Sequence, residues 1–155
     1  RSLSYHQRYW AGLIALAIEY WEPSNGMTTE AEEQLIMKFC KVLDENGGGG
    51  EVETWGKQFL TTLGQNRAQK IQAPTKTKES LHRWIKEQAG YYEVEITPSG
   101  PRKKLKSINF NAMSEEQFRE YYRDAFSVCW RYVLSKSFDT DQAAHNAVEQ
   151  LLSVG

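Results

Sequence analysis

The sequence predicts an α+β fold that is mostly helical, with about six helices around an apolar first helix and a small β-hairpin near residues 91–110. Two observations lead to this prediction. Apolar residues recur at helical spacing along most of the chain, and one short stretch alternates with period two. A length of 155 residues suits one domain with a sizeable core, so we expect residues 1–155 to form a single domain.

The first helix is expected from about Ser4 to Trp21, ending before Pro23. Its side chains from Tyr9 onward are apolar on nearly all sides, as in a helix that the rest of the fold surrounds. The chain does not begin with methionine. A buried helix at its start suggests that an N-terminal segment of the full protein is missing.

The second helix follows Thr28 and Thr29, whose hydroxyl groups can cap it, and its first turn is acidic. It is expected to end near Asn46, because the connector Gly47–Gly50 is too rich in glycine for a helix. This connector lacks the Lys-Ser/Thr ending and the preceding strand of a phosphate-binding P-loop. We therefore interpret it as a flexible link.

Two further helices are expected over about Val52–Ile71 and Thr77–Ala89, with Gly90 as the C-cap residue of the latter. The helix over residues 52–71 is expected to turn four apolar residues inward: Trp55, Phe59, Leu60 and Leu63.

Residues Tyr91–Ile96 alternate with period two, and a turn at Pro98–Pro101 leads into the basic stretch Arg102–Lys106. This pattern is typical of a β-hairpin with one polar face. We expect Ser107–Phe110 to complete the β element.

The fifth helix opens with a capping box formed by Ser114 and Gln117. A final helix is expected from Asp139 to Leu152. The fifth helix carries one wide apolar face: Phe118, Tyr121, Tyr122, Ala125, Phe126, Cys129, Trp130, Val133 and Leu134.

The net charge of −1 conceals a separation of charge along the chain. Residues 1–60 have a net charge of −4, residues 61–137 of +6 and residues 138–155 of −3. Such separation can create a local field that attracts anions. The simpler interpretation, that the charges merely face solvent, stays open.

No apolar run reaches the ~18–20 residues that cross a membrane, and the start of the chain lacks the features of a signal peptide. Cys40 and Cys129 are isolated on apolar helical faces, which is typical of buried free thiols in a reducing compartment. We therefore expect a soluble protein of the cytoplasm that has no membrane partner.

No catalytic constellation emerges, so we expect no enzyme, no metal and no cofactor. His6, His82 and His145 fall in three different helices without metal-ligand spacing. Glu93 and Glu95 share one face of a strand, as the carboxylates of a nuclease would. Pairing of these two residues with the basic residues across the hairpin is the favoured interpretation.

A basic surface interleaved with aromatic rings favours nucleic-acid binding. Basic side chains neutralise phosphates, and rings stack on unpaired bases. The candidate phosphate contacts are Lys76, Lys78, Arg83, Lys86, Arg102, Lys103, Lys104 and Lys106. Tyr91 or Tyr92 would provide a stacking platform, and Arg119 and Arg123 of the fifth helix could extend the surface. A solvated basic face and a protein interface are the alternatives.

Several phrases of the sequence resemble an uncharacterised family of proteins from tailed phages and prophages. The resemblance spans the whole chain and is carried by residues 1–10 (RSLSYHQRYW), 20–23 (YWEP), 84–92 (WIKEQAGYY), 107–111 (SINFN) and 126–132 (FSVCWRY). It implies a further N-terminal segment, expected to be β, before the position of Arg1.

The opening phrase, with Arg1, His6, Gln7, Arg8 and Trp10, is similar to that of the lambda Orf (NinB) recombination mediators over about the first 20 residues. Those proteins are dimers that bind single-stranded DNA and assist the loading of a recombinase. The resemblance implies a phage accessory protein that binds nucleic acid, preferably single-stranded DNA, in recombination or replication, with a homodimer as one arrangement. The alternative is a non-enzymatic protein-interaction module that engages or inhibits a host protein.

Overall fold

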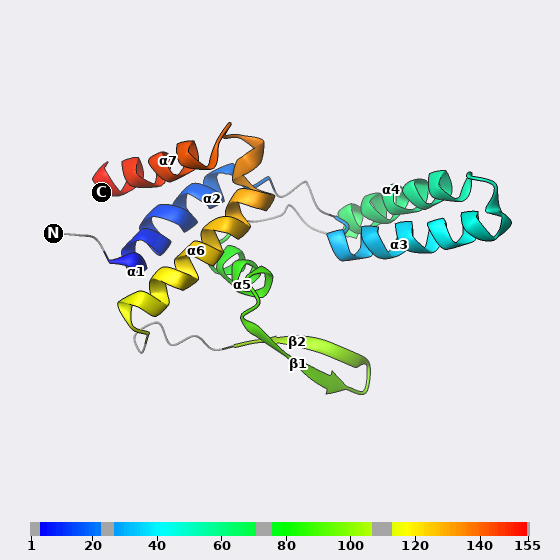
Figure 1. Ribbon diagram of the computed structural model, residues 1–155, viewed down its shortest axis with the longest axis horizontal. Helices are drawn as coiled ribbons and strands as arrows, with labels where there is room; N and C mark the ends of the chain where they lie inside the picture. Colours follow the sequence, from blue (N-terminus) through cyan, green and yellow to red (C-terminus); the bar gives the residue numbers. More distant parts are fainter. Residues whose placement is uncertain (1–3, 23–26, 71–75, 107–112, 155) are drawn as a thin grey trace. The chain divides into compact units, whose positions relative to one another are not determined.

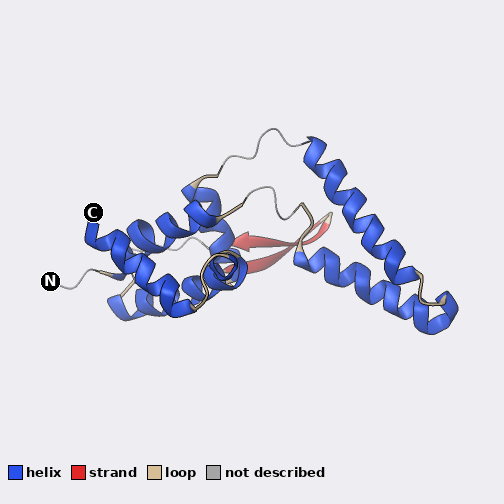
Figure 2. Ribbon diagram, turned by 90° about the horizontal axis from the view of Figure 1, so that it is seen from above, coloured by secondary structure: helices blue, strands red, loops and turns tan. Residues whose placement is uncertain are grey.

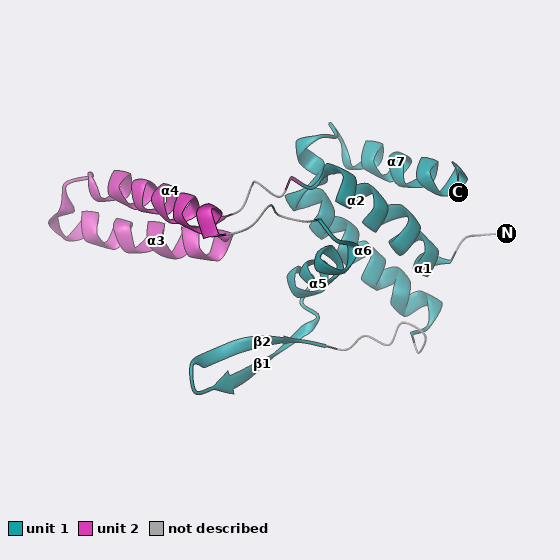
Figure 3. Ribbon diagram, turned by 180° about the vertical axis from the view of Figure 1, so that it is seen from behind, with its two compact units in different colours: residues 1–21, 76–155 teal, residues 22–75 magenta. Residues whose placement is uncertain are grey.

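The computed structural model describes residues 4–22, 27–70, 76–106 and 113–154. The chain divides into two compact units, which Figure 3 shows in different colours. We call residues 1–21 with 76–155 the core unit, and residues 22–75 the two-helix unit. The prediction of a single domain stays a prediction.

The predicted α+β, mostly helical fold class is confirmed. Helices make up most of both units, and the strands of the described residues form one antiparallel pair (Figure 2). The first helix ends at Tyr20 with Trp21 as its C-cap residue, as predicted. The predicted strand at Ser107–Phe110 lies outside the described residues.

The first helix of the core unit is continuous and consists of α1 (Tyr5–Gln7), η1 (Arg8–Ile14) and α2 (Ala15–Tyr20). The Ser4 hydroxyl caps it by accepting a hydrogen bond from the Gln7 N–H at 3.3 Å. Its middle third, η1, is a π-helix. The fully buried residues of this helix are Tyr9, Leu13, Ile14 and Ala17, which confirms that it is a central packing element.

The other helices of the core unit are α5 (Lys78–Gln88), α6 (Glu115–Tyr132) and α7 (Asp141–Val154), with a short 3₁₀ turn, η4 (Leu134–Lys136), after α6 (Figure 1). The predicted capping box of Ser114 and Gln117 is present at the start of α6. The last helix begins at Asp141, two residues later than predicted. The Thr140 hydroxyl accepts from the Ala143 N–H, so Thr140 caps the helix where Asp139 was expected to start it.

Close contact between helices depends on a small residue in η1. A Cβ atom added at Gly12 would lie 2.7 Å from Cγ1 of Val148 on α7. An ion pair between Arg8 and Glu149 joins the same two elements at the surface.

The predicted β-hairpin is also present. Strands β1 (Tyr92–Thr97) and β2 (Gly100–Leu105) pair in antiparallel fashion, and we call them the ribbon. Gly90 ends α5 with φ of +87°, and the Tyr91 N–H donates to the Lys86 carbonyl at 2.8 Å. This C-cap turn attaches the ribbon directly to the end of α5.

The two-helix unit contains α3 (Glu30–Leu43) and α4 (Val52–Lys70), joined by η2 (Asp44–Gly48) and residues 49–51. Thr29 and Glu32 form a capping box at the start of α3. The guanidinium of Arg67 donates to Glu32 at 2.6 Å and to the Met27 carbonyl at 3.1 Å, so the end of α4 is fixed to the start of α3. Gly49 and Gly50 have positive φ, a backbone conformation that glycine adopts without strain.

The prediction that Trp55 and Phe59 turn inward is wrong, since they are 58% and 54% exposed. Only one side of α4 can face α3 within a pair of helices, and that side is occupied at Gly56. A Cβ atom there would lie 2.5 Å from the sulfur of the buried Cys40. The aromatic residues next to this seam are therefore left uncovered within their own unit.

The seam between α3 and α4 gives a first testable prediction. Gly56→Ala should lower the free energy of unfolding by about 1–3 kcal/mol, because the added methyl group collides with Cys40. Thermal unfolding followed by circular dichroism would measure it. Gly64→Ala, in the same helix but with its nearest atom at 3.5 Å, is the matched control and should stabilise by about 0.5–1 kcal/mol. Equal effects of the two substitutions would contradict the close approach.

Candidate nucleic-acid interface

The ribbon carries the densest group of predicted phosphate contacts. Its register places Glu93 opposite Lys104 and Glu95 opposite Arg102 on one face. The Arg102 Nε donates to the Glu95 carboxylate at 2.6 Å, so the expected pairing across the hairpin is confirmed at this position. All four basic residues of the segment are exposed: Arg102, Lys103, Lys104 and Lys106.

Lys103 differs from the other three because it lies on the opposite face of the ribbon. Its ammonium group is 3.5 Å from the Glu87 carboxylate at the end of α5 and 4.8 Å from the centre of the Tyr92 ring. Lys104 and Lys106 have no carboxylate within ion-pair distance among the described residues. These two ammonium groups are therefore the ribbon charges most readily available to a phosphate.

The two candidate stacking tyrosines have different surroundings. The Tyr91 ring packs edge-on against the fully buried Tyr121, with 5.1 Å between ring centres. Burial, with the charges of Asp124 and Glu120, raises the pKa of Tyr91. Tyr92 is half-buried on the ribbon itself, so it is the ring that the ribbon presents.

The remaining candidates lie on helices. Lys76, Lys78 and Arg83 are exposed, but the first two lie at the start of α5 and the ribbon begins at its far end. Lys86 is only 9% exposed, and burial lowers the pKa of its ammonium group. Lys86 therefore packs its stem into the core.

Two exposed arginines on α6 form a separate group. Arg119 is 3.6 Å from Glu116 on its own helix, and Arg123 has no carboxylate within ion-pair distance among the described residues. The structure thus divides the predicted basic surface into three parts: the ribbon, the start of α5 and the exposed side of α6.

Sequence reasoning did not identify a chain of hydrogen bonds in the core. The Tyr121 hydroxyl donates to the Tyr9 hydroxyl at 2.9 Å, and Tyr9 Oη lies 2.5 Å from Nδ1 of His82. Burial, with the positive charges of Lys86 and Arg83, lowers the pKa of His82 to about 4. The imidazole is therefore neutral at pH 7, and its Nδ1 can accept a hydrogen bond from the Tyr9 hydroxyl.

This chain of hydrogen bonds joins η1, α5 and α6. Tyr9 and Tyr121 are fully buried, so no substrate reaches their hydroxyl groups, and we interpret the chain as structural. The sequence does not predict this chain of hydrogen bonds, because a tyrosine on the apolar face of a helix cannot be distinguished from other core residues by its spacing.

The other potential reactive groups are dispersed. Cys40 and Cys129 are free and buried, as expected, and burial raises the pKa of Cys129 to about 12. His145 stacks on Phe126 with 3.6 Å between ring centres. Within the described residues, no group of three or more His, Cys, Asp or Glu side chains is arranged to hold a metal ion.

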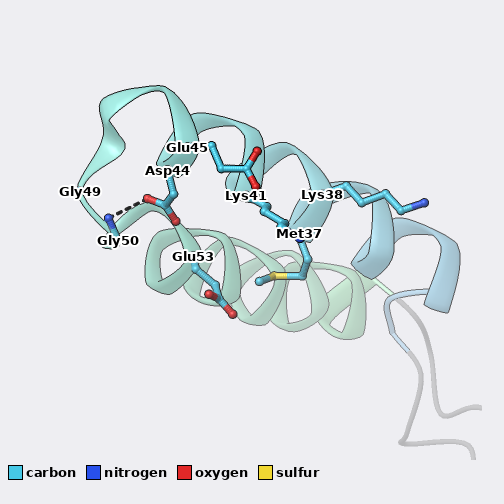
Figure 4. A pocket seen from close by; sticks show the side chains of 8 residues that line it. All are labelled: Met37, Lys38, Lys41, Asp44, Glu45, Gly49, Gly50 and Glu53. Atoms are coloured by element: carbon cyan, nitrogen blue, oxygen red, sulfur yellow. Dashed lines mark hydrogen bonds between the residues drawn. The ribbon is translucent and has the colours of Figure 1, made fainter.

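An open groove lies on one side of the two-helix unit, near the glycine connector (Figure 4). Asp44 Oδ1 accepts a hydrogen bond from the Gly50 N–H at 2.9 Å, which holds the glycine connector against the end of the first helix of the unit at one side of the groove. The groove is lined by charges of both signs: Lys38, Lys41, Asp44, Glu45 and Glu53, together with Met37, Gly49 and Gly50. This mixture gives it no preference for an anion.

None of the helices in the described part of the chain combines the length and the apolar character that crossing a membrane requires. The sequence pattern of a family described as "protein of unknown function (DUF1367)" matches residues 1–154. No curated protein and no solved structure matches the chain.

The hydrogen-bond chain gives a second prediction. Tyr9→Phe should lower the free energy of unfolding by about 1–3 kcal/mol, because it leaves the buried Tyr121 hydroxyl without its acceptor. Tyr20→Phe is the control, since the Tyr20 ring packs on Phe138 and its hydroxyl has no bond within the described residues. The control should change stability by less than about 0.5 kcal/mol in urea unfolding. Similar losses for both variants would argue against the hydrogen-bond chain.

A third prediction concerns pH. The pKa of His82 is about 4 in the folded protein and about 6.5 when unfolded, so the unfolded chain binds more protons between these values. Stability should be complete above pH 6.5 and should fall as the pH drops toward 4. Urea unfolding across this range would measure the loss, and His82→Gln should flatten it. An unchanged pH profile in that variant would show that other groups cause the loss.

Proposed function

Since the chain belongs to this family of unknown function over residues 1–154, its role has to be inferred from its surfaces, and we propose that it binds nucleic acid through the ribbon. The ligand is single-stranded DNA, and the setting is phage or prophage recombination or replication in the bacterial cytoplasm. One observation carries the proposal. The ribbon and the residue that follows it, Lys106, expose four basic side chains, and two of these have no carboxylate partner among the described residues.

The geometry of the ribbon suits a phosphate backbone. Arg102 and Lys104 lie on one face of β2 and Lys106 follows two positions later, which spaces the three charges in roughly 7 Å steps. Exposed ion pairs such as Arg102–Glu95 contribute little, typically below about 1 kcal/mol, so a phosphate can replace the carboxylate. The Tyr92 ring lies on the other face of the ribbon, beside the Lys103 ammonium group, and is the ring on which a base could stack.

A second candidate function, the engagement of a host protein, is favoured by a different observation on the same ribbon. Val94 and Ile96 are 61% and 81% exposed on the strand that carries the two glutamates. A two-stranded ribbon also leaves the outer edges of its strands free to pair with another chain. A protein partner would use these apolar side chains and edges rather than the lysines.

The proposal gives a fourth prediction. Lys104→Ala/Lys106→Ala should weaken binding to labelled single-stranded DNA and reduce the slope of log K against log salt by about 1.4, since each phosphate contact contributes about 0.7. Fluorescence anisotropy at several salt concentrations would measure both effects, with duplex DNA as a second ligand. Lys38→Ala/Lys41→Ala removes the same charge from the two-helix unit and should leave the slope unchanged.

The outcomes separate the two functions. Absence of binding to either DNA at low salt would overturn the nucleic-acid proposal. A protein partner that stays bound after nuclease treatment and is lost on Val94→Ser/Ile96→Ser would favour the second function.

A further inference from the structure

The two-helix unit exposes large apolar side chains to an unusual degree. Leu35 and Phe39 of α3 are 69% and 61% exposed, and Trp55 and Phe59 of α4 are 58% and 54% exposed. Two more residues of α3, Val42 and Leu43, are 53% and 39% exposed. We call these six residues the apolar face.

The residues from the two helices lie on one side of the unit. Met37 and Lys41 of α3 line the same groove as Glu53 of α4 (Figure 4). Positions two apart on an α-helix point in nearly opposite directions, about 200° apart. Leu35 and Phe39 precede Met37 and Lys41 by two positions, and Trp55 follows Glu53 by two. The apolar face therefore lies opposite the charged groove on both helices.

The area of the apolar face matches what a stable interface needs. Multiplying the exposed fraction of each residue by the typical surface of a large apolar residue gives a total exposed area on the order of 600 Å². The largest apolar patch on a typical monomeric protein exposes about 300–600 Å², so the apolar face is at the upper end of that range. A standard interface takes about 800 Å² from each partner, with roughly two thirds of it apolar in homodimers.

We propose that the apolar face docks a second copy of this chain, so that two two-helix units form a four-helix bundle. Two copies of one amphipathic helix pair can cover each other through an isologous, two-fold contact, and no other surface is required. The charges of the unit argue against anionic occupants other than a second copy, whose repulsion salt can screen. Residues 22–75 carry eight acidic and five basic residues, a net charge of −3, which repels nucleic acid and anionic lipid surfaces.

Added salt should strengthen the association of two copies, whereas it should weaken the binding of DNA. Each copy brings a net charge of −3 to the contact, so added salt should screen the repulsion and tighten the dimer. Analytical ultracentrifugation of the nuclease-treated full chain, from low to high micromolar concentration and at two salt concentrations, would measure this. Dimer formation that strengthens with salt is the expected result.

Substitutions locate the contact. Phe39→Asp should weaken the dimer roughly 100-fold, since a two-fold contact loses the same side chain twice. Leu35→Asp, at the most exposed position of the apolar face, is a second variant that should act in the same way. Ile96→Asp makes a similar change at an 81% exposed position of the ribbon and should leave the dimer unchanged. Circular dichroism confirms that each variant keeps its helices.

Three results would overturn the proposal. One is a monomer at every concentration. Another is a dimer that Phe39→Asp and Leu35→Asp leave intact while Ile96→Asp disrupts it. The third is a monomer that binds vesicles of neutral phospholipid and loses this binding on Phe39→Asp, which would assign the apolar face to a lipid surface.

Discussion

The hydroxyl group of Tyr9 accepts a hydrogen bond from Tyr121 and lies within hydrogen-bond distance of His82, and both tyrosines are fully buried. Three helices that are distant in sequence meet at this oxygen. An unpaired hydroxyl in such a place costs free energy, so the three helices are held to one relative rotation. Every buried side-chain nitrogen and oxygen of the described residues has a partner, which fits a core whose polar groups are fully paired.

The position of the ribbon depends on that core. Tyr91 packs on Tyr121, its N–H donates to the last turn of α5, and its carbonyl accepts from the Lys106 N–H at 3.1 Å. The ribbon itself has exposed residues on both faces, and an isolated pair of strands is marginally stable in water. Its rigidity therefore comes from this one end, while the basic side chains beyond it stay open to solvent.

Local features of the fold could be predicted from the sequence, because local interactions determine them. The Ser114 capping box, the Gly90 C-cap and the pairing of Glu95 with Arg102 each depend on residues within a few positions or across one tight turn. The exposure of Trp55 and the burial of Lys86 could not be predicted, because each depends on which elements pack together. An apolar stripe in the sequence predicts that one face of a helix is buried. It does not predict whether the surface that covers this face belongs to the same unit.

The two-helix unit is inserted between two segments of the core unit, which the chain leaves at Trp21 and re-enters at Lys76. The first helix and α5 must therefore meet across a long connection, and closing a loop costs entropy that grows with its length, by about 0.6 kcal/mol for each doubling. Arg67 joins the end of α4 to Met27 and Glu32, so the two ends of the helix pair lie close together. Once it is formed, the pair of helices shortens the loop that separates the two segments of the core unit.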